Sequence, residues 1–157
     1  MAAKPPHTSV PDRVLQETLQ LLRRWERREE SPDMNPESPL RAVVADLSGR
    51  LFRNLGVLDF MIDRLATRRT VAPAMRAVLR IALVQMFYQS GIPDASAVDT
   101  AVRWTRRHRG KAAAGFVNAV LREAGRRGLP ETGAYGELPE YLRLRLNREL
   151  YEHWGNR

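Results

Sequence analysis

The sequence predicts an all-α fold, with about seven helices and an additional C-terminal tail helix. Apolar residues recur three and four positions apart along most of the chain, which is the spacing of one face of an amphipathic helix. No convincing run alternates apolar and polar residues, as a half-buried strand would. Prolines and glycines separate the periodic stretches. With 157 residues, 43% of them hydrophobic, the chain is long enough to bury one core.

The first helix follows a proline-rich start, residues 1–11, that we expect to be flexible. It is predicted from about Asp12 to Glu29, and three prolines in the stretch SPDMNPESP end it. The second helix is predicted from Leu40 to Asn54. Its inward-facing side chains are expected to be Val43, Val44, Leu47, Leu51 and Phe52.

Gly56 is expected to end the second helix, and the segment VLDFMIDRLA, residues 57–66, to form the third. The fourth helix, residues 72–91, is expected to be capped by Thr70 or the residue after it and to hold Pro73 in its first turn. This fourth segment is apolar on most of its circumference. A helix of that kind belongs at the centre of a bundle.

Pro93 precedes the fifth helix, which Asp94 or Ser96 is expected to cap. The sixth helix is predicted over residues 111–128, directly after the fifth, so that the two form an antiparallel hairpin. Glycines and prolines then interrupt the helical pattern before a last amphipathic segment that begins with Pro139. The predicted divisions of the chain are a flexible N-terminus (1–11), a helical bundle (12–128), a linker (129–138) and a tail helix (139–157).

The positive charge of the chain is concentrated in this hairpin. The net charge is +8, and residues 103–127 carry seven arginines and Lys111 against a single acid, Glu123. Such a concentration favours an anionic partner, of which nucleic acid is the commonest. The alternative is that the charge only keeps a basic protein soluble.

The cations of the hairpin are predicted to gather at its two ends, in the stretches RWTRRHRGK and LREAGRRG. A helix C-terminus stabilises a cation by ~0.3–1 kcal/mol, which explains some of these arginines without any ligand. Arg109 and Lys111 are expected where the next helix begins, where the helix dipole disfavours them, so they are the strongest candidates for phosphate contact. The predicted nucleic-acid contacts are Arg103, Arg106, Arg107, Arg109, Lys111, Arg122, Arg126 and Arg127.

The residue types that catalysis or metal binding needs are scarce. The chain has no cysteine, its three histidines (His7, His108 and His153) lie far apart, and it has no glycine-rich phosphate loop. The sequence therefore favours a binding module, with no catalytic residue, metal or cofactor expected in this chain. It has no apolar run of membrane-spanning length and no signal-peptide core, so we expect a cytoplasmic protein without a membrane partner.

Two side-chain types in the apolar helices are expected to be structural. Asn118, an amide within the run FVNAVL, is expected to satisfy a backbone group of a neighbouring loop and to fix the register of packing. Trp25, Trp104 and Trp154 are expected in the core or an interface rather than as platforms for base stacking.

The stretch LRIALVQMFYQSGIPDASAVDTAVRWTR, the following GFVNAVLRE and the earlier GRLFRNLGVLDFMI together resemble the NusB-like family, in which a two-part helical bundle binds RNA. The resemblance covers about Asp12 to Arg127 and implies two sub-bundles. It includes Pro93 and Asn118 as residues of the family pattern. The matching positions are Gly49, Leu51, Arg53, Leu58, Asp59, Leu79, Arg80, Gln85, Pro93, Ala97, Val98, Phe116, Val117, Asn118 and Leu121.

Two kinds of family member share this bundle: a free transcription antitermination factor, and the N-terminal domain of the bacterial small-subunit (16S) ribosomal RNA cytosine-5 methyltransferase. Arg122, where the free factor more typically has an acid, and the tail LPEYLRLRLNRELYEHWG favour the second. That resemblance implies a domain that positions ribosomal RNA for its own C-terminal methyltransferase domain, which is absent from this chain and uses S-adenosylmethionine. The alternative is a free antitermination factor that binds RNA and a ribosomal protein.

Overall fold

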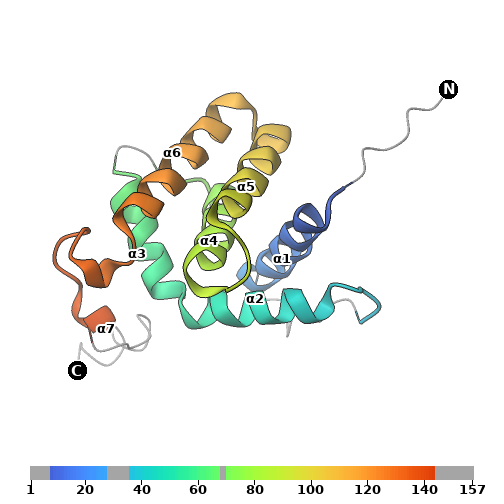
Figure 1. Ribbon diagram of the computed structural model, residues 1–157, viewed down its shortest axis with the longest axis horizontal. Coiled ribbons are helices and arrows are strands. Elements are labelled where there is room, and N and C mark those ends of the chain that lie inside the picture. The colour runs from blue at the N-terminus through green and yellow to red at the C-terminus, as the bar shows by residue number, and fades with distance from the viewer. Residues whose placement is uncertain (1–7, 28–35, 68–69, 144–157) are drawn as a thin grey trace.

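The computed structural model describes residues 8–27, 36–67 and 70–143. Within these ranges the chain forms seven α-helices and one short 3-10 helix and contains no strand, which confirms the all-α prediction. Figure 1 shows the α5–α6 hairpin above α4, with α2 below it, α3 on the left and α1 on the right. The elements are α1 (Val10–Glu26), α2 (Arg41–Arg53), α3 (Leu55–Leu65), α4 (Pro73–Tyr88), α5 (Asp94–Arg109), α6 (Lys111–Arg127), η1 (Pro130–Thr132) and α7 (Glu140–Arg143).

Helix α4 forms the centre of the bundle, as its apolar circumference predicts. It packs against α1, α2, α3, α5 and α6. The side chains from Ile81 to Gln85 are all buried, as are those from Ala77 to Leu79. One continuous apolar core therefore joins α4 to the helices around it, and α4 positions the hairpin relative to the rest of the molecule.

Arg80 interrupts the apolar surface of α4 and ties two further helices to it. Its side chain is only 11% exposed. Its Nε and Nη2 donate to the two carboxylate oxygens of Asp59 on α3, at 2.8 and 3.0 Å, and its Nη1 donates to Glu26 at the end of α1, at 3.2 Å. A two-point pair of this kind is specific in geometry as well as in charge. It fixes how α1 and α3 meet α4.

Helices α1 and α3 begin earlier than the sequence predicts. Helix α1 begins at Val10 because Ser9 caps it: the Ser9 side chain accepts from the Asp12 N–H, and the Asp12 carboxylate accepts from the Ser9 N–H. Gly56 does not end α2 but lies inside α3. Asn54 ends α2 instead, and its side-chain amide donates to the Arg50 carbonyl at 2.7 Å.

The predicted caps of α4 and α5 were wrong for the same reason. Neither helix has a side-chain cap: Ala72 precedes Pro73 at the start of α4, and Pro93 precedes α5. The Pro93 carbonyl accepts from the Ser96 and Ala97 N–H groups at 2.9 and 3.2 Å. A proline stands at the start of both helices. Pro73 is the first residue of α4, where its ring fixes the backbone angle that a helix needs. Pro93 stands directly before α5, at the position that a capping side chain would occupy.

One inward-facing prediction for α2 was also wrong. Val43 is 42% exposed, whereas Val44, Leu47 and Leu51 are buried. Successive residues of a helix are turned by about 100° from one another, which carries Val43 off the face that Val44 buries.

Residues 129–143 follow α6 and pack against the bundle. Tyr135 and Pro130 are buried, and the Tyr135 ring lies 6.4 Å from the Phe60 ring of α3. The guanidinium of Arg127 lies 5.4 Å from the centre of the same tyrosine ring. The predicted linker is therefore attached to α3 and α6 by an aromatic contact. The predicted tail helix begins as α7 directly after Pro139, and residues 144–157 lie outside the described ranges.

Helices α5 and α6 are joined by one residue, Gly110. Its backbone angles are φ 89° and ψ 176°, a combination that is essentially restricted to glycine. The Gly110 N–H donates to the Arg106 carbonyl, and its own carbonyl accepts from the Ala114 N–H, both at 3.1 Å. A Cβ at this position would meet no atom within 4 Å, so the requirement for glycine is one of backbone conformation and not of space.

We expect Gly110→Ala to lower the free energy of unfolding by about 1–3 kcal/mol, because alanine is strained at these backbone angles. Gly115→Ala is the matched control: Gly115 lies inside α6, is exposed, and also has no neighbour within 4 Å of a Cβ. That substitution is expected to raise the free energy of unfolding by about 0.5–1 kcal/mol, as alanine does in a helix interior. Equal effects of the two substitutions in urea unfolding would show that the turn does not depend on glycine.

Candidate nucleic-acid interface

The cations of the hairpin face outward because both helices bury their apolar sides against each other and against α4. Ala101, Trp104 and Thr105 are buried on α5. Val117 and Leu121 are buried on α6. The remaining faces of both helices are left to solvent, and they hold nearly all of the charged residues. The apolar seam thus decides where the positive charge lies.

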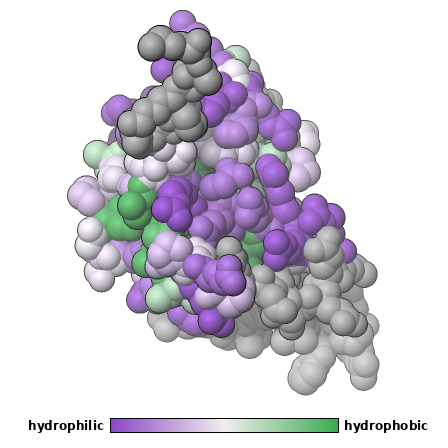
Figure 2. Space-filling model, turned by 90° about the vertical axis from the view of Figure 1, so that its right-hand side faces the viewer, coloured by the Kyte–Doolittle hydropathy of each residue, from purple (hydrophilic) through white to green (hydrophobic). Residues whose placement is uncertain are grey.

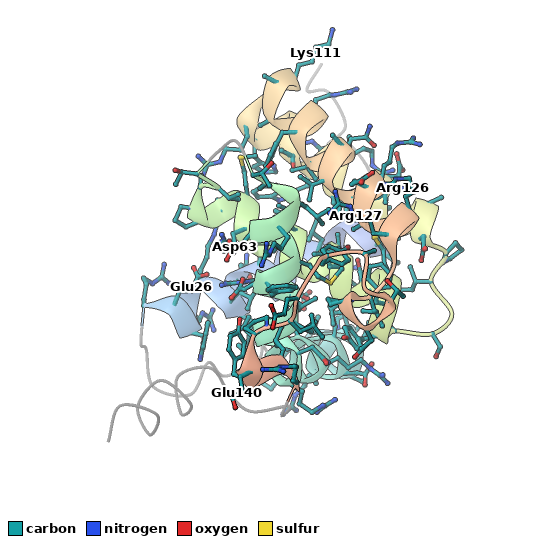
Figure 3. All side chains as sticks on the ribbon, turned by 90° about the vertical axis from the view of Figure 1, so that its left-hand side faces the viewer. Glu26, Asp63, Lys111, Arg126, Arg127 and Glu140 are labelled. Carbon is teal, nitrogen blue, oxygen red and sulfur yellow. The ribbon has the colours of Figure 1, made fainter. Side chains whose placement is uncertain are left out.

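Four exposed cations surround the Gly110 turn, and we call them the hairpin tip: Arg106, Arg107, Arg109 and Lys111. Lys111 projects from the end of the hairpin, away from the body of the molecule (Figure 3). No ion pair joins any of the four to a carboxylate among the residues that the structure describes. Their charge is not offset within this part of the protein.

Arg109 does not lie where the sequence predicts. It is the last residue of α5, at a helix C-terminus, where the helix dipole favours a cation. Lys111 alone of the pair begins α6, where the dipole disfavours it. The electrostatic reason for expecting phosphate contact therefore applies to Lys111 only. Arg109 remains a candidate because it is exposed.

Arg103 lies one turn before the hairpin tip and is committed to two carboxylates. It donates to Asp12 of α1 at 3.0 Å and pairs with Asp99 one turn earlier on α5. The hydrogen bond and charge of Asp12 raise the pKa of Arg103. Burial acts to raise the pKa of Asp12, but the bonds from Ser9 and Arg103 outweigh it and lower that pKa. Arg103 thus connects α5 to the capped start of α1.

The other three predicted contacts lie toward the opposite end of α6. Arg126 and Arg127 both bind Glu123, the latter through its Nε at 2.7 Å. Lys111 and Arg126 are 15 residues apart, which is about 22 Å along a helix, and Figure 3 shows them well separated. The hydrogen bonds and charges of Arg126 and Arg127 lower the pKa of Glu123 to about 2. Apart from Arg103, the predicted contacts therefore form two groups: the hairpin tip, and a second group at the far end of α6 that contains the acid Glu123.

Asn118 has a different role from the one predicted. Its side-chain oxygen accepts from Arg122 Nε at 3.1 Å, one turn along the same helix. No bond from Asn118 to a neighbouring loop occurs in the described parts of the chain. Because Asn118 is only partly buried and Arg122 is exposed, the pair lies on the outer surface of α6. In the described structure the amide oxygen binds a cation of the same helix.

Comparison with known proteins decides the family. The NusB family pattern matches residues 7–126 of the chain. The chain belongs to the NusB family. This NusB-family chain is also 34% identical over 95 residues to the N-terminal region of the probable ribosomal RNA small subunit methyltransferase B of Bacillus subtilis (strain 168). That match covers 60% of this chain and 21% of the relative, so the chain spans about a fifth of the length of the relative. No solved structure matches it.

Two residues of the NusB-like sequence pattern meet in the structure. Arg80 and Asp59, 21 positions apart on α4 and α3, form the two-point pair described above. Their opposite charges were visible in the sequence, but their contact depends on how the two helices cross. This pair links two separate stretches of the pattern in the folded chain.

An aromatic pair at the hairpin tip was missed by sequence reasoning. The rings of Trp104 and His108 are stacked, with centroids 4.3 Å apart and planes inclined by 18°. The indole N–H of Trp104 donates to the Gln16 side chain of α1 at 3.1 Å. The four-residue spacing of the two rings on a predicted helix was the available signal, since such residues face each other.

The rest of the described surface offers fewer binding features. Figure 2 shows a predominantly hydrophilic face with a smaller apolar area. Among the described residues the exposed large apolar side chains are Val10, Trp25 and Val43, and Trp25 contacts the Phe52 ring at 5.1 Å. The described helices include none that is both long and apolar enough to cross a membrane. These same residues contain no group of three side chains suited to holding a metal ion.

The charge on Glu123 can be tested directly. Its pKa of about 2, against an ordinary 4.5, means that the carboxylate is ionised throughout the working range and loses its pairing only as the pH falls from about 4.5 through 2. We expect a carboxyl-carbon NMR titration to give a midpoint of about 2 for the natural chain. The midpoint should rise toward 4.5 in R126A/R127A. An ordinary midpoint in the natural chain would mean that the two arginines are not held by Glu123 in solution.

Proposed function

We propose that this NusB-family domain binds ribosomal RNA through the hairpin tip, and that it does so on behalf of a ribosomal RNA cytosine-5 methyltransferase. The observation that carries the proposal is the group of four exposed cations, Arg106, Arg107, Arg109 and Lys111, without carboxylate partners in the described structure. The contrast with the other four predicted residues selects these. Arg103, Arg126 and Arg127 are paired with carboxylates, and Arg122 donates to the Asn118 amide in the part of α6 away from the tip.

Phosphate is the chemical group that this surface suits best. Arginine presents a planar fork of donors that matches two phosphate oxygens at once, and three of the four residues are arginines. Neutralising phosphates releases condensed counterions, which supplies affinity without reading sequence. An RNA strand would therefore be held by its backbone at the tip, with bases read only where they are unpaired.

The link to a methyltransferase is supported by similarity to the Bacillus subtilis protein, which is named as a probable ribosomal RNA small subunit methyltransferase. In this proposal the domain holds the RNA, and a separate methyltransferase domain of its own parent enzyme carries out the reaction. S-adenosylmethionine would donate the methyl group. In this proposal no chemical step is placed on the residues of this chain.

Salt dependence of RNA affinity tests the proposal. We expect the chain to bind 16S ribosomal RNA transcripts with a salt-dependent affinity. The logarithm of the binding constant should fall linearly with the logarithm of the salt concentration, with a slope of about −0.7 for each phosphate neutralised on single strands. R107A/R109A should reduce the slope by about 1.4 units and weaken binding. R126A/R127A is the matched control, since it removes the same number of charges. Its effect should be smaller because both side chains are already bound to Glu123.

Two results would contradict the proposal. The first is an RNA affinity that R107A/R109A leaves unchanged. The second is an RNA affinity with no dependence on salt together with tight binding to a ribosomal protein, which would favour a free antitermination factor. Thermal unfolding of both double variants confirms that they remain folded.

A further inference from the structure

The stacked pair Trp104 and His108 lies next to the hairpin tip in the sequence, and the proposed phosphate contacts do not use it. We propose that His108 is a stacking platform for one unpaired RNA base. This inference rests on the proposed RNA-binding function and adds to it a contact that distinguishes single-stranded from paired RNA.

The His108 ring is held in place before any ligand arrives. One of its faces lies on the Trp104 indole, with the centroids 4.3 Å apart. Its Nδ1 lies 2.8 Å from the Trp104 carbonyl oxygen, to which it donates, so the ring is fixed in tilt as well as position. Trp104 is only 8% exposed and is itself fixed by its bond to Gln16 of α1. A ring that is already ordered loses little further freedom on binding.

The imidazole is also accessible. His108 is exposed, and Trp104 is its one ring contact among the residues that the structure describes. Arg107 and Arg109 flank it in the sequence, and both are exposed. Asp99 of α5 and Asp12 of α1 are both engaged by Arg103. Cations for a sugar-phosphate backbone and a flat ring for a base are therefore brought together at one place.

This combination suits single-stranded RNA. Unpaired bases stack on aromatic side chains, histidine included, and the nearby cations follow the backbone. A base within a duplex already has its two faces covered by its neighbours, so it cannot stack on His108 without being pulled out. Since every base has a flat face, the platform selects an unpaired base more than any one sequence, with adenine favoured over uracil by its larger ring system.

The test compares two short single-stranded RNAs that carry the same phosphates. One contains a single adenosine among uridines, and the other has an abasic nucleotide in place of that adenosine. We expect the natural chain to bind the adenosine RNA about tenfold more tightly than the abasic RNA. H108A should bind the two RNAs equally, whereas H108F, which keeps a flat ring against Trp104, should retain the preference. H108K introduces a cation without a ring, and it should bind the two RNAs equally, as H108A does.

The variants separate stacking from the alternatives. A preference for adenosine that survives in H108A, or one that is lost in H108F as fully as in H108A, would overturn the platform. In either case salt-dependent binding of both RNAs would leave the proposed function standing. Failure of the natural chain to bind either RNA would overturn both. Thermal unfolding of H108A and H108F shows whether a loss of preference comes from a loss of fold.

Discussion

A one-residue connection between α5 and α6 is the constraint on which the rest of this surface depends. Gly110 adopts backbone angles that other residues avoid, and it reverses the chain without a loop. The two helices must then pack along their whole length, so their apolar sides face inward. Charged residues on both sides of the turn are left on the outer surface, and the four closest to Gly110 are exposed. The basic ends of an otherwise buried helical pair follow from this geometry.

Positive charge in a sequence is not equivalent to a binding surface, because some of the cations of this hairpin are paired with acids and others are not. Glu123 lies three and four residues before Arg126 and Arg127, within reach of both on one helix. Arg103 is engaged by Asp12 and Asp99, and Arg122 by an amide. The cations around Gly110 have no acid at such spacings. Local pairing reduces the field at one end of the hairpin and leaves it at the other, where a phosphate strand would meet the least internal competition.

Helical period was enough to predict the fold class, the central place of α4 and the antiparallel hairpin, because burial of one face repeats along each helix. The pairings at i+3 and i+4, such as Arg126 with Glu123, could also have been read from the sequence. The contacts that cross between helices could not: Arg80 with Asp59 and Trp104 with Gln16 depend on crossing angles. The cap predictions were wrong because a proline, and not a polar side chain, stands at the start of both helices. The prediction for Asn118 was wrong because its side chain binds Arg122 instead of a loop.

We propose that the bundle supports the hairpin and that the tip of the hairpin contacts RNA. The most direct measurement is a map of backbone amide NMR shifts as a short single-stranded RNA is added to the natural chain. The account predicts that the largest changes fall within residues 104–111, with α2 and the Tyr135 region unaffected. Changes centred on α1 and α2, or spread evenly over the molecule while the tip stays unperturbed, would contradict it.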